Sequence, residues 1–252
     1  MPKLSLENVR HSFSVDTPPK TVHAVGPISF ALEEGEFVAI VGPSGCGKST
    51  LLRLAAGLLE ADEGAIRFTG ERIDGPSPRR GMVFQQPALF PWLDVTGNVA
   101  FGSRFRSLGP AASRDLTSNL ITAVGLDGFE HFYPTALSGG MQQRAALART
   151  LAGGPELLLL DEPFGALDQQ TRAQMQAWLA GLLGDRGITA LLVTHDIEEA
   201  VFLADRVLVM SGRPGRLRAA FDIGLPADRR QRVRTGPEFV ARKAEILAAL
   251  ES

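Results

Sequence analysis

One short string constrains the fold of this chain more than any other feature of its 252 residues. It runs Gly42-Pro43-Ser44-Gly45-Cys46-Gly47-Lys48-Ser49-Thr50 and fits the spacing G-x-x-x-x-G-K-[ST] of a phosphate-binding loop. The apolar run Phe37–Val41 precedes it and predicts a buried strand, and helically spaced leucines follow it at 48–58. A strand, a glycine loop and a helix in this order predict an α/β fold.

The residue types in this loop suit a nucleotide. Glycines let backbone N–H groups turn toward phosphate oxygens without Cβ clashes, and the start of a helix favours an anion. Lys48 is expected to reach the β- and γ-phosphates, and Ser49 to ligate Mg²⁺. We therefore expect residues 42–50 to bind ATP with Mg²⁺. Cys46 occupies a variable position, where a small tolerated residue is a better explanation than a redox group.

A second chemical feature is a pair of carboxylates at the end of a predicted strand. The apolar run Leu157–Leu160 leads directly into Asp161 and Glu162. In open parallel sheets the ligand site lies beyond the carboxyl ends of the strands. We expect Asp161 to hold Mg²⁺, directly or through water, and Glu162 to act as general base on the attacking water. Taken alone, the pattern also fits a strand running into a solvated turn, and the phosphate-binding loop favours the site.

The rest of the chain alternates predicted strands and helices, which favours a mainly parallel sheet. A polar, proline-containing stretch at 14–21 is predicted to be a loop. The other predicted strands are 4–9, 28–32, 157–160, 190–193 and 206–210. The other predicted helices are 169–184 and 197–204.

We predict one domain over residues 1–252 with an insertion. Its α/β nucleotide-binding core comprises 1–86 and 155–225, and a helical subdomain occupies 87–154. The tail at 226–252 combines a basic stretch with a short amphipathic helix that ends at Leu250, and a solvated face is expected there. The basic residues are Arg229, Arg230, Arg232 and Arg234.

Composition excludes several classes of protein. The net charge of −2 and pI of about 6.1 argue against a nucleic-acid binder with a basic face. The segment 1–5 lacks the apolar run of a signal peptide, and the longest aliphatic runs fall well short of the roughly 20 residues of a membrane helix. The single cysteine, Cys46, excludes an internal disulfide. If this chain works at a membrane, another protein must hold it there.

A third motif narrows the class of nucleotide-binding protein. The string Leu137-Ser138-Gly139-Gly140-Met141-Gln142-Gln143-Arg144 resembles the signature of the ABC ATPase family. Three further residues resemble marks of that family in the same order along the chain. They are Gln85 (Q-loop), Asp168 (D-loop) and His195 (switch histidine). This resemblance covers nearly the whole chain and implies the P-loop NTPase fold of ABC ATPases, with an antiparallel N-terminal part beside the parallel core and an inserted helical lobe.

The resemblance also implies roles for these residues. In this family two subunits associate head to tail, and Ser138, Gly139 and Gly140 of one would clamp the ATP held by Lys48 of the other. Gln85 would contact Mg²⁺ and the attacking water. The same resemblance implies that His195 holds the γ-phosphate and orients Glu162; an isolated histidine at a strand end would be the alternative. Asp168 would organise the opposite site, and it also suits the N-cap of the helix that follows.

Two positions depart from the commonest family residues. Phe13 occupies the place of the family's aromatic residue, often tyrosine, and is expected to stack on adenine; a core phenylalanine is the alternative. Met141 replaces the usual glutamine of the signature, which is expected to modulate affinity without abolishing function.

Three segments resemble the ATPases of nitrate, sulfonate and taurine importers: 89–93, 161–168 and 210–216. ATPases of pyrimidine-precursor and polyamine importers look similar. This resemblance implies a peripheral subunit on the cytoplasmic face of the inner membrane, working with transmembrane permease subunits and an extracytoplasmic solute-binding protein. The bulky Phe90 and Trp92 would receive a short helix of the membrane subunit, or else pack inside the helical lobe.

Two other classes stay open as alternatives. A non-transport ABC ATPase of DNA maintenance or translation usually carries long coiled coils or two cassettes, and neither pattern is present. A P-loop kinase for a small molecule would share the phosphate-binding loop, but the signature at Ser138–Gly140 argues against it.

Overall fold

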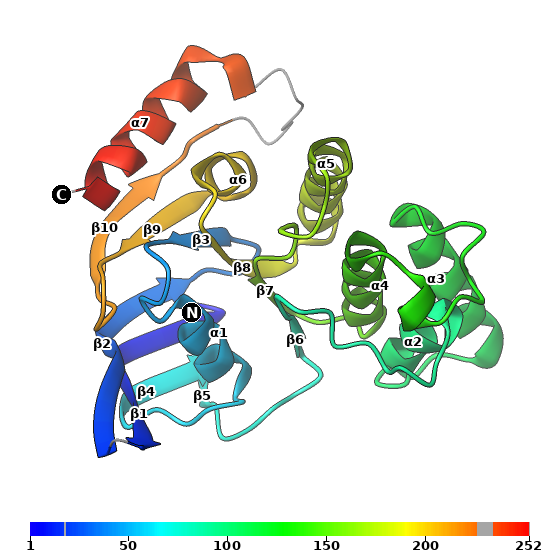
Figure 1. The fold of residues 1–252 in the computed structure, drawn as a ribbon, viewed down its shortest axis with the longest axis horizontal. Helices are drawn as coiled ribbons and strands as arrows, with labels where there is room; N and C mark the ends of the chain where they lie inside the picture. Colours follow the sequence, from blue (N-terminus) through cyan, green and yellow to red (C-terminus); the bar gives the residue numbers. More distant parts are fainter. Residues whose placement is uncertain (18, 226–233, 252) are drawn as a thin grey trace. The chain divides into compact units, whose positions relative to one another are not determined.

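The computed structural model describes residues 1–17, 19–225 and 234–251 (Figure 1). The chain divides into two compact units. The first unit comprises Met1–Ser77 and Ala180–Ser252, and the second comprises Pro78–Leu179. Of the described helices, none is both long and apolar enough to cross a bilayer.

The first unit begins with a four-stranded sheet in the order β2-β1-β4-β5. All its pairings are antiparallel, as the family resemblance implied. Its strands are β1 (Leu4–Asp16), β2 (Pro19–Leu32), β4 (Glu63–Phe68) and β5 (Glu71–Arg72).

The loop predicted at 14–21 is wrong, because β1 and β2 continue through most of it as a hairpin. Ser14 pairs with Thr21, and Asp16 pairs with Pro19. Ser14 and Thr21 are both exposed, so this end of the ribbon has no buried face and lacks the apolar alternation that would predict strands. Proline is tolerated as the first residue of a strand, which is where Pro19 stands.

The second sheet of this unit is mainly parallel, as predicted. Strand β3 (Phe37–Val41) lies between β8 (Thr189–Thr194) and β9 (Arg206–Met210), parallel to both. Every residue of β3 and β8 is buried, which explains their continuous apolar sequences. Strand β10 (Leu217–Asp222), which the sequence did not predict, pairs antiparallel with β9.

Three helices lie in the first unit: α1 (Lys48–Ala56), α6 (Ile197–Leu203) and α7 (Pro237–Glu251). Helix α7 packs on α6 through its buried face, which includes Phe239 and Ile246 (Figure 1). Arg234 differs from the solvated face expected of the tail, since its guanidinium lies 4.1 Å from the centre of the Phe202 ring. Burial lowers the pKa of Arg234, while Glu198, Asp196 and Glu199 oppose that shift. Arg229, Arg230 and Arg232 lie outside the described residues.

The second unit contains the signature segment. Its two strands, β6 (Arg80–Val83) and β7 (Leu157–Asp161), are parallel. Its helices are α2 (Val95–Ser103), α3 (Pro110–Ala123), the 3₁₀ turn η1 (Pro134–Ala136), α4 (Gly139–Ala152) and most of α5 (Gln169–Arg186). Helices α2 and α4 approach closely at Gly102, where an added Cβ would lie 2.0 Å from the carbonyl oxygen of Arg149.

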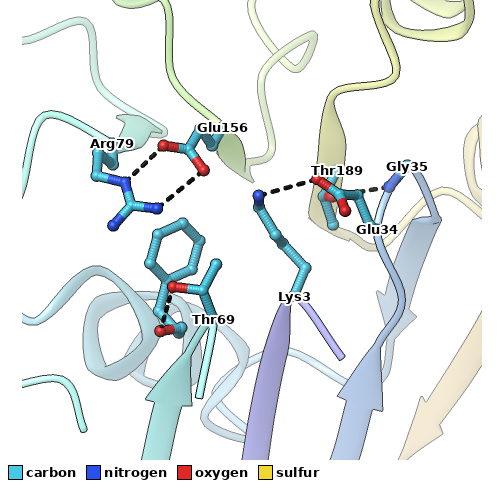
Figure 2. A network of polar contacts seen from close by, with 8 residues as sticks. Lys3, Glu34, Gly35, Thr69, Arg79, Glu156 and Thr189 are labelled. Carbon is cyan, nitrogen blue, oxygen red and sulfur yellow. Dashed lines mark hydrogen bonds and ion pairs between the residues drawn. The ribbon is translucent and has the colours of Figure 1, made fainter. Parts of the chain in front are cut away.

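Polar contacts fix the strand entrances within each unit (Figure 2). In the second unit Arg79 donates to both carboxylate oxygens of Glu156, at 2.5 and 3.1 Å, just before β6 and β7 begin. In the first unit the N–H of Gly35 donates to Thr189 Oγ1 at 2.9 Å, which ties the turn before β3 to the start of β8.

Candidate active site

The phosphate-binding loop connects β3 to α1 and depends on glycine geometry. Gly45 and Gly47 have φ of 73° and 101°, in the left-handed region that other residues rarely adopt. A Cβ at Gly47 would lie 2.5 Å from the carbonyl oxygen of Ala24, so strand β2 presses on the loop from behind. Helix α1 starts without a side-chain cap, and the positive end of its dipole favours an anion.

Lys48 is the cation of this loop and is almost completely buried, with 6% of its surface exposed. Its Nζ donates to the carbonyl oxygens of Gly42 at 2.7 Å and Pro43 at 3.0 Å. These two bonds hold the ammonium group inside the loop, where phosphate oxygens would also be attracted to it. The residues at 43–45 form the exposed tip.

Within the second unit Gln85 contacts one member of the acidic pair, Glu162. Asp161 ends the buried strand β7 and is 3% exposed, whereas Glu162 is half-buried. The side-chain amide of Gln85 donates to Glu162 Oε2 at 3.1 Å. An amide and a carboxylate at this distance can hold one water molecule in common and orient it.

The backbone of Glu162 is strained. Its φ is 46°, a left-handed conformation that costs a non-glycine residue roughly 1–3 kcal/mol. This turn sends the side chain away from the direction that continued strand geometry would give it. Neither the strain nor the contact with Gln85 is visible in the sequence, because both depend on how the chain leaves β7.

The signature residues form the start of α4. Ser138 caps this helix by accepting from the N–H of Met141 at 3.3 Å. Ser138 and Gly139 are exposed, and the nearest atom to a Cβ added at Gly139 would be Ala166 Cβ at 3.9 Å. Gly140 is tighter, with Leu167 Cδ2 at 2.9 Å from an added Cβ. The signature therefore packs against the segment before Asp168, and its residues Ser138 and Gly139 are exposed to solvent.

Asp168 caps α5, the structural alternative foreseen for it. Its Oδ1 accepts from the N–H groups of Gln170 at 3.1 Å and Thr171 at 3.0 Å. Hydrogen bonds from the side chain and backbone of Thr171 and from the backbone of Gln170 lower the pKa of this exposed carboxyl. Burial lowers the pKa of Arg144 in the signature helix, and the charge of Asp168 opposes that shift.

His195 stands between β8 and α6 in the first unit, and its side chain is exposed. The residues on both sides of it are fixed. Thr194 Oγ1 donates to the buried Glu199 and accepts from the N–H of Asp196 at 3.0 Å. Asp196 in turn caps α6 through the N–H groups of Glu198 and Glu199. This network of polar contacts gives the histidine a defined backbone from which to act.

Phe13 lies on β1, paired with Val22 of β2, and is 37% exposed. Its ring makes an edge contact with His11, with the ring centres 4.7 Å apart. The alternative of a core phenylalanine is therefore wrong, and stacking of this partly exposed ring on adenine stays a prediction.

An apolar groove opens on the second unit beside the Gln85 segment. It has a volume of about 310 Å³ and is lined by residues that include Phe84, Phe90, Phe101, Phe105 and Arg149. Phe90 packs on Phe101, with ring centres 4.6 Å apart. Trp92 next to it is 70% exposed. Phe90 therefore packs in the lobe, whereas Trp92 touches the Phe90 ring, with ring centres 5.5 Å apart, and stays largely exposed.

Three residues are predicted to hold Mg²⁺. Ser49 lies in the first turn of α1, in the first unit, and Gln85 and Asp161 lie in the second. Among the described residues no cluster of three or more His, Cys, Asp or Glu side chains could hold a metal. Magnesium is usually bound through one or two carboxylates together with substrate phosphates and water, so the predicted site, with Asp161 as its carboxylate, needs no such cluster.

The sequence did not predict which residue contacts the exposed tip of the phosphate-binding loop. Arg213, in the turn between β9 and β10, donates to the carbonyl oxygen of Gly45 from Nε at 3.2 Å and from Nη2 at 3.0 Å. The two residues are 168 positions apart, so no local pattern predicts the contact.

Comparison with known proteins gives a consistent result. A family model described as "ABC transporter" matches residues 25–165. The taurine import ATP-binding protein TauB of Pelagibacter ubique is 45% identical, over 92% of this chain and 89% of that protein. The nitrate import ATP-binding protein NrtD of Synechocystis is 46% identical, over 91% and 89% respectively. A putative ATP-binding protein of Brucella abortus is 43% identical, over 99% and 94%.

Solved structures agree. The ATP-binding cassette MJ0796, in a dimeric post-hydrolysis state bound to ADP and Pi, has a TM-score of 0.80 and 30% identity. The match covers 88% of this chain and all of that one.

Proposed function

The chain belongs to the ABC transporter family, and on that basis we propose that it is the ATP-hydrolysing subunit of an importer of the nitrate, sulfonate or taurine type. The observation that carries the proposal is the hydrogen bond between Gln85 and Glu162, because it pairs a water-orienting amide with a carboxylate at a strand end. Importers of pyrimidine precursors or polyamines remain the alternative for the substrate class.

The phosphate-binding loop supplies the affinity for ATP. The N–H groups at the start of α1 and the Lys48 ammonium group neutralise the β- and γ-phosphates. Phe13 stacks on the adenine through its exposed face. Ser49, Asp161 and Gln85 are the residues that would hold Mg²⁺, which would supply positive charge to the phosphate oxygens.

Hydrolysis depends on three side chains. Glu162 accepts the proton of the attacking water, and Gln85 orients that water through its contact with the carboxylate. His195 holds the γ-phosphate from its place after β8. The strained backbone of Glu162 supports this role, since such strain clusters at functional sites.

Two copies of the chain complete each site. Ser138, Gly139 and Gly140 of one copy present an exposed helix start, which suits the γ-phosphate held by the other copy. Asp168 organises the opposite site while capping α5. ATP then forms part of the interface, and its hydrolysis lets the dimer open.

The apolar groove receives the membrane partner. A short helix of a transmembrane permease subunit would place apolar side chains against Phe84 and Phe90, with Trp92 at its edge. The chain would then lie on the cytoplasmic face of the inner membrane. An extracytoplasmic solute-binding protein would deliver the substrate to the permease.

Phosphate release and nucleotide binding by the purified subunit test the ATPase assignment. Glu162→Gln should bind ATP and dimerise stably but release phosphate at least about 100-fold more slowly. Glu156→Gln is the matched control, since that carboxylate pairs with Arg79 away from Glu162. Near-normal turnover of Glu162→Gln would overturn its role as base. Phosphate transferred to an acceptor would indicate a kinase, and salt-sensitive nucleic-acid binding would indicate a non-transport ATPase.

Uptake measurements test the substrate class. A strain lacking the gene would be supplied with nitrate, taurine, alkanesulfonates, polyamines or a pyrimidine precursor. Loss of one uptake, restored by the unaltered gene but not by Lys48→Ala, would identify the substrate. Full uptake of every compound by the strain lacking the gene would contradict the proposed importer subtype and leave the ATPase assignment in place.

A further inference from the structure

The turn between β9 and β10 lies against the phosphate-binding loop. It comprises Ser211–Arg216, which is part of the segment 210–216 that resembles importer ATPases. Two bonds close its base: the N–H of Ser211 donates to the carbonyl oxygen of Arg216 at 2.9 Å, and the N–H of Arg216 donates to Ser211 Oγ at 3.1 Å. A turn closed in this way holds its tip in one place.

The backbone of this turn is wedged between β2 and the loop. The N–H of Gly215 donates to the carbonyl oxygen of Ala24 at 3.1 Å, and its own carbonyl oxygen accepts from Gly26 at 2.8 Å. A Cβ on Gly215 would lie 2.1 Å from the carbonyl oxygen of Cys46, so only glycine allows this approach. The turn, β2 and the loop therefore support one another.

Arg213 makes the most specific of these contacts. It directs two donors at a single acceptor, the carbonyl oxygen of Gly45, at 3.2 and 3.0 Å. The same peptide group is also held from its other end, because the N–H of Cys46 donates to the carbonyl oxygen of Pro43 at 3.3 Å. Gly45 has φ of 73°, so the correct orientation of this peptide is one of several that glycine could adopt.

We propose that Arg213 is a positioning residue for nucleotide binding: it fixes the Gly45–Cys46 peptide and thereby keeps the phosphate-binding loop in its open, cradle-like form. The proposal rests on the proposed function only for its effect on ATP. Arg213 acts through Gly45, and the N–H groups of the loop make the phosphate contacts. A simpler role for Arg213, as a positive charge that attracts ATP from a distance, gives different results below.

Kinetics provide the first test. Arg213→Ala should raise the KM for ATP about five- to tenfold and change kcat less than twofold, because the loop must be reordered before each binding event. Arg213→Lys keeps the positive charge but not the two guanidinium donors, and its KM for ATP should lie between those of Arg213→Ala and the unaltered protein. Arg216→Ala is the matched control in the same turn, since its side chain lies over Gly26; its KM should match that of the unaltered protein.

Salt separates positioning from charge attraction. In 0.5 M salt, roughly, the attraction between exposed charges is screened, so a purely electrostatic effect would disappear. A positioning effect should persist. Full recovery by Arg213→Lys, or equal KM values for Arg213→Ala and the unaltered protein in high salt, would overturn the proposal.

Cys46 provides a second readout that needs no ATP. It is the only cysteine of the chain, 1% exposed, and adjacent to Gly45. Its reaction with a chromogenic aromatic disulfide reports how often the loop loses its ordered, cradle-like form and exposes the thiol. Arg213→Ala should speed this reaction several-fold at unchanged thermal stability, and Arg216→Ala should not. Unchanged thiol reactivity in Arg213→Ala would overturn the proposal and leave the ATPase assignment intact. Failure of the unaltered protein to bind nucleotide would overturn the ATPase assignment, even if thiol reactivity in Arg213→Ala rose as expected.

Discussion

The helices α1 and α4 both start beside glycines, and the two starts are built very differently. At α1 the N-cap is Gly47, with no side-chain cap, and Lys48 behind it is buried. At α4 the N-cap is Ser138, which caps its own helix, and Gly139 after it is exposed. Both starts favour anions for the same reason, the positive end of the helix dipole.

The difference lies in what stands around each glycine. A Cβ at Gly47 would meet the carbonyl oxygen of Ala24 at 2.5 Å, and one at Gly42 would meet that of Met210 at 2.9 Å. A Cβ at Gly139 would meet only Ala166, at 3.9 Å. A buttressed glycine loop is a binding site in its own right, whereas an open helix start suits one half of a site that a second molecule completes.

The largest expected effect comes from breaking the buttressed site. Gly47→Ala should abolish nucleotide binding at every protein concentration and lower phosphate release at least about 100-fold, because the Cβ clashes with β2 and φ of 101° is strained. Equilibrium binding of a fluorescent ATP analogue measures this directly. Binding that recovers at high protein concentration would contradict the contrast between the two helix starts.

The same substitution at the open site should separate binding from turnover. Gly139→Ala should leave nucleotide binding by single subunits unchanged and lower phosphate release about ten- to a hundredfold, because the new methyl group faces the second copy. Its thermal stability should not fall, since alanine suits a helix better by roughly 0.5–1 kcal/mol.

Gly181→Ala is the control for that substitution. Gly181 lies in α5 with no atom within 4 Å of an added Cβ, so it should gain similar stability at full activity. If Gly139→Ala turned over ATP as fast as Gly181→Ala, the signature would not face a second copy.

A smaller effect is expected from the cap itself. Ser138→Ala should cost about 1 kcal/mol of unfolding free energy and also reduce turnover, because Ser138 serves both the helix and the proposed dimer. Asp94→Ala removes the corresponding cap of α2, where Asp94 accepts from Gly97 at 2.7 Å. It should lose similar stability in urea unfolding and keep its turnover. Equal loss of turnover in both variants would point to a purely structural role for Ser138.

The smallest effect concerns pH. The pKa of the Asp168 carboxyl is lowered from its ordinary value of 3.8 by hydrogen bonds from Thr171 and Gln170. A carboxyl whose folded-state pKa is depressed stabilises the fold above its unfolded pKa, and that contribution is lost as the pH falls through the folded value. Asp168→Asn should therefore be slightly less stable than the unaltered protein at neutral pH and equal to it in strong acid. Urea unfolding at each pH measures this difference. A difference in unfolding free energy between the two proteins that stayed the same from neutral pH to strong acid would contradict the lowered pKa of Asp168.

The two helix starts also differ in how far the sequence predicts them. The loop at 42–50 is a contiguous string, so its strand, glycines and helix were predicted correctly and are confirmed. The contacts that support it come from Ala24 and Arg213, which are remote in the chain, and no periodicity predicts them. The domain boundaries at 87 and 154 and the roles of individual site residues remain predictions.

Elsewhere the errors have a physical cause. The ribbon at 14–21 was predicted as a loop because exposed residues on a two-stranded ribbon show no apolar alternation. Strand β10 escaped notice for a similar reason, since its residues alternate only between half-buried and exposed. The strands at 37–41, 157–160 and 190–193 were predicted well because burial on both faces leaves a continuous apolar run.

Two hydrogen bonds attach helix α4 to the segment that carries Gln85. Gln143 donates to the carbonyl oxygen of Phe84 at 3.0 Å, and Arg149 donates to that of Ala88 at 2.6 Å. These two anchors clamp the helix that starts at Ser138 to the segment that carries Gln85. A helix attached to a segment at two points moves with that segment as one rigid body. A helix attached at one point could rotate and absorb part of the movement. If a partner pressed on the aromatic groove, we would expect the start of α4 at Ser138 to move together with the segment of Gln85.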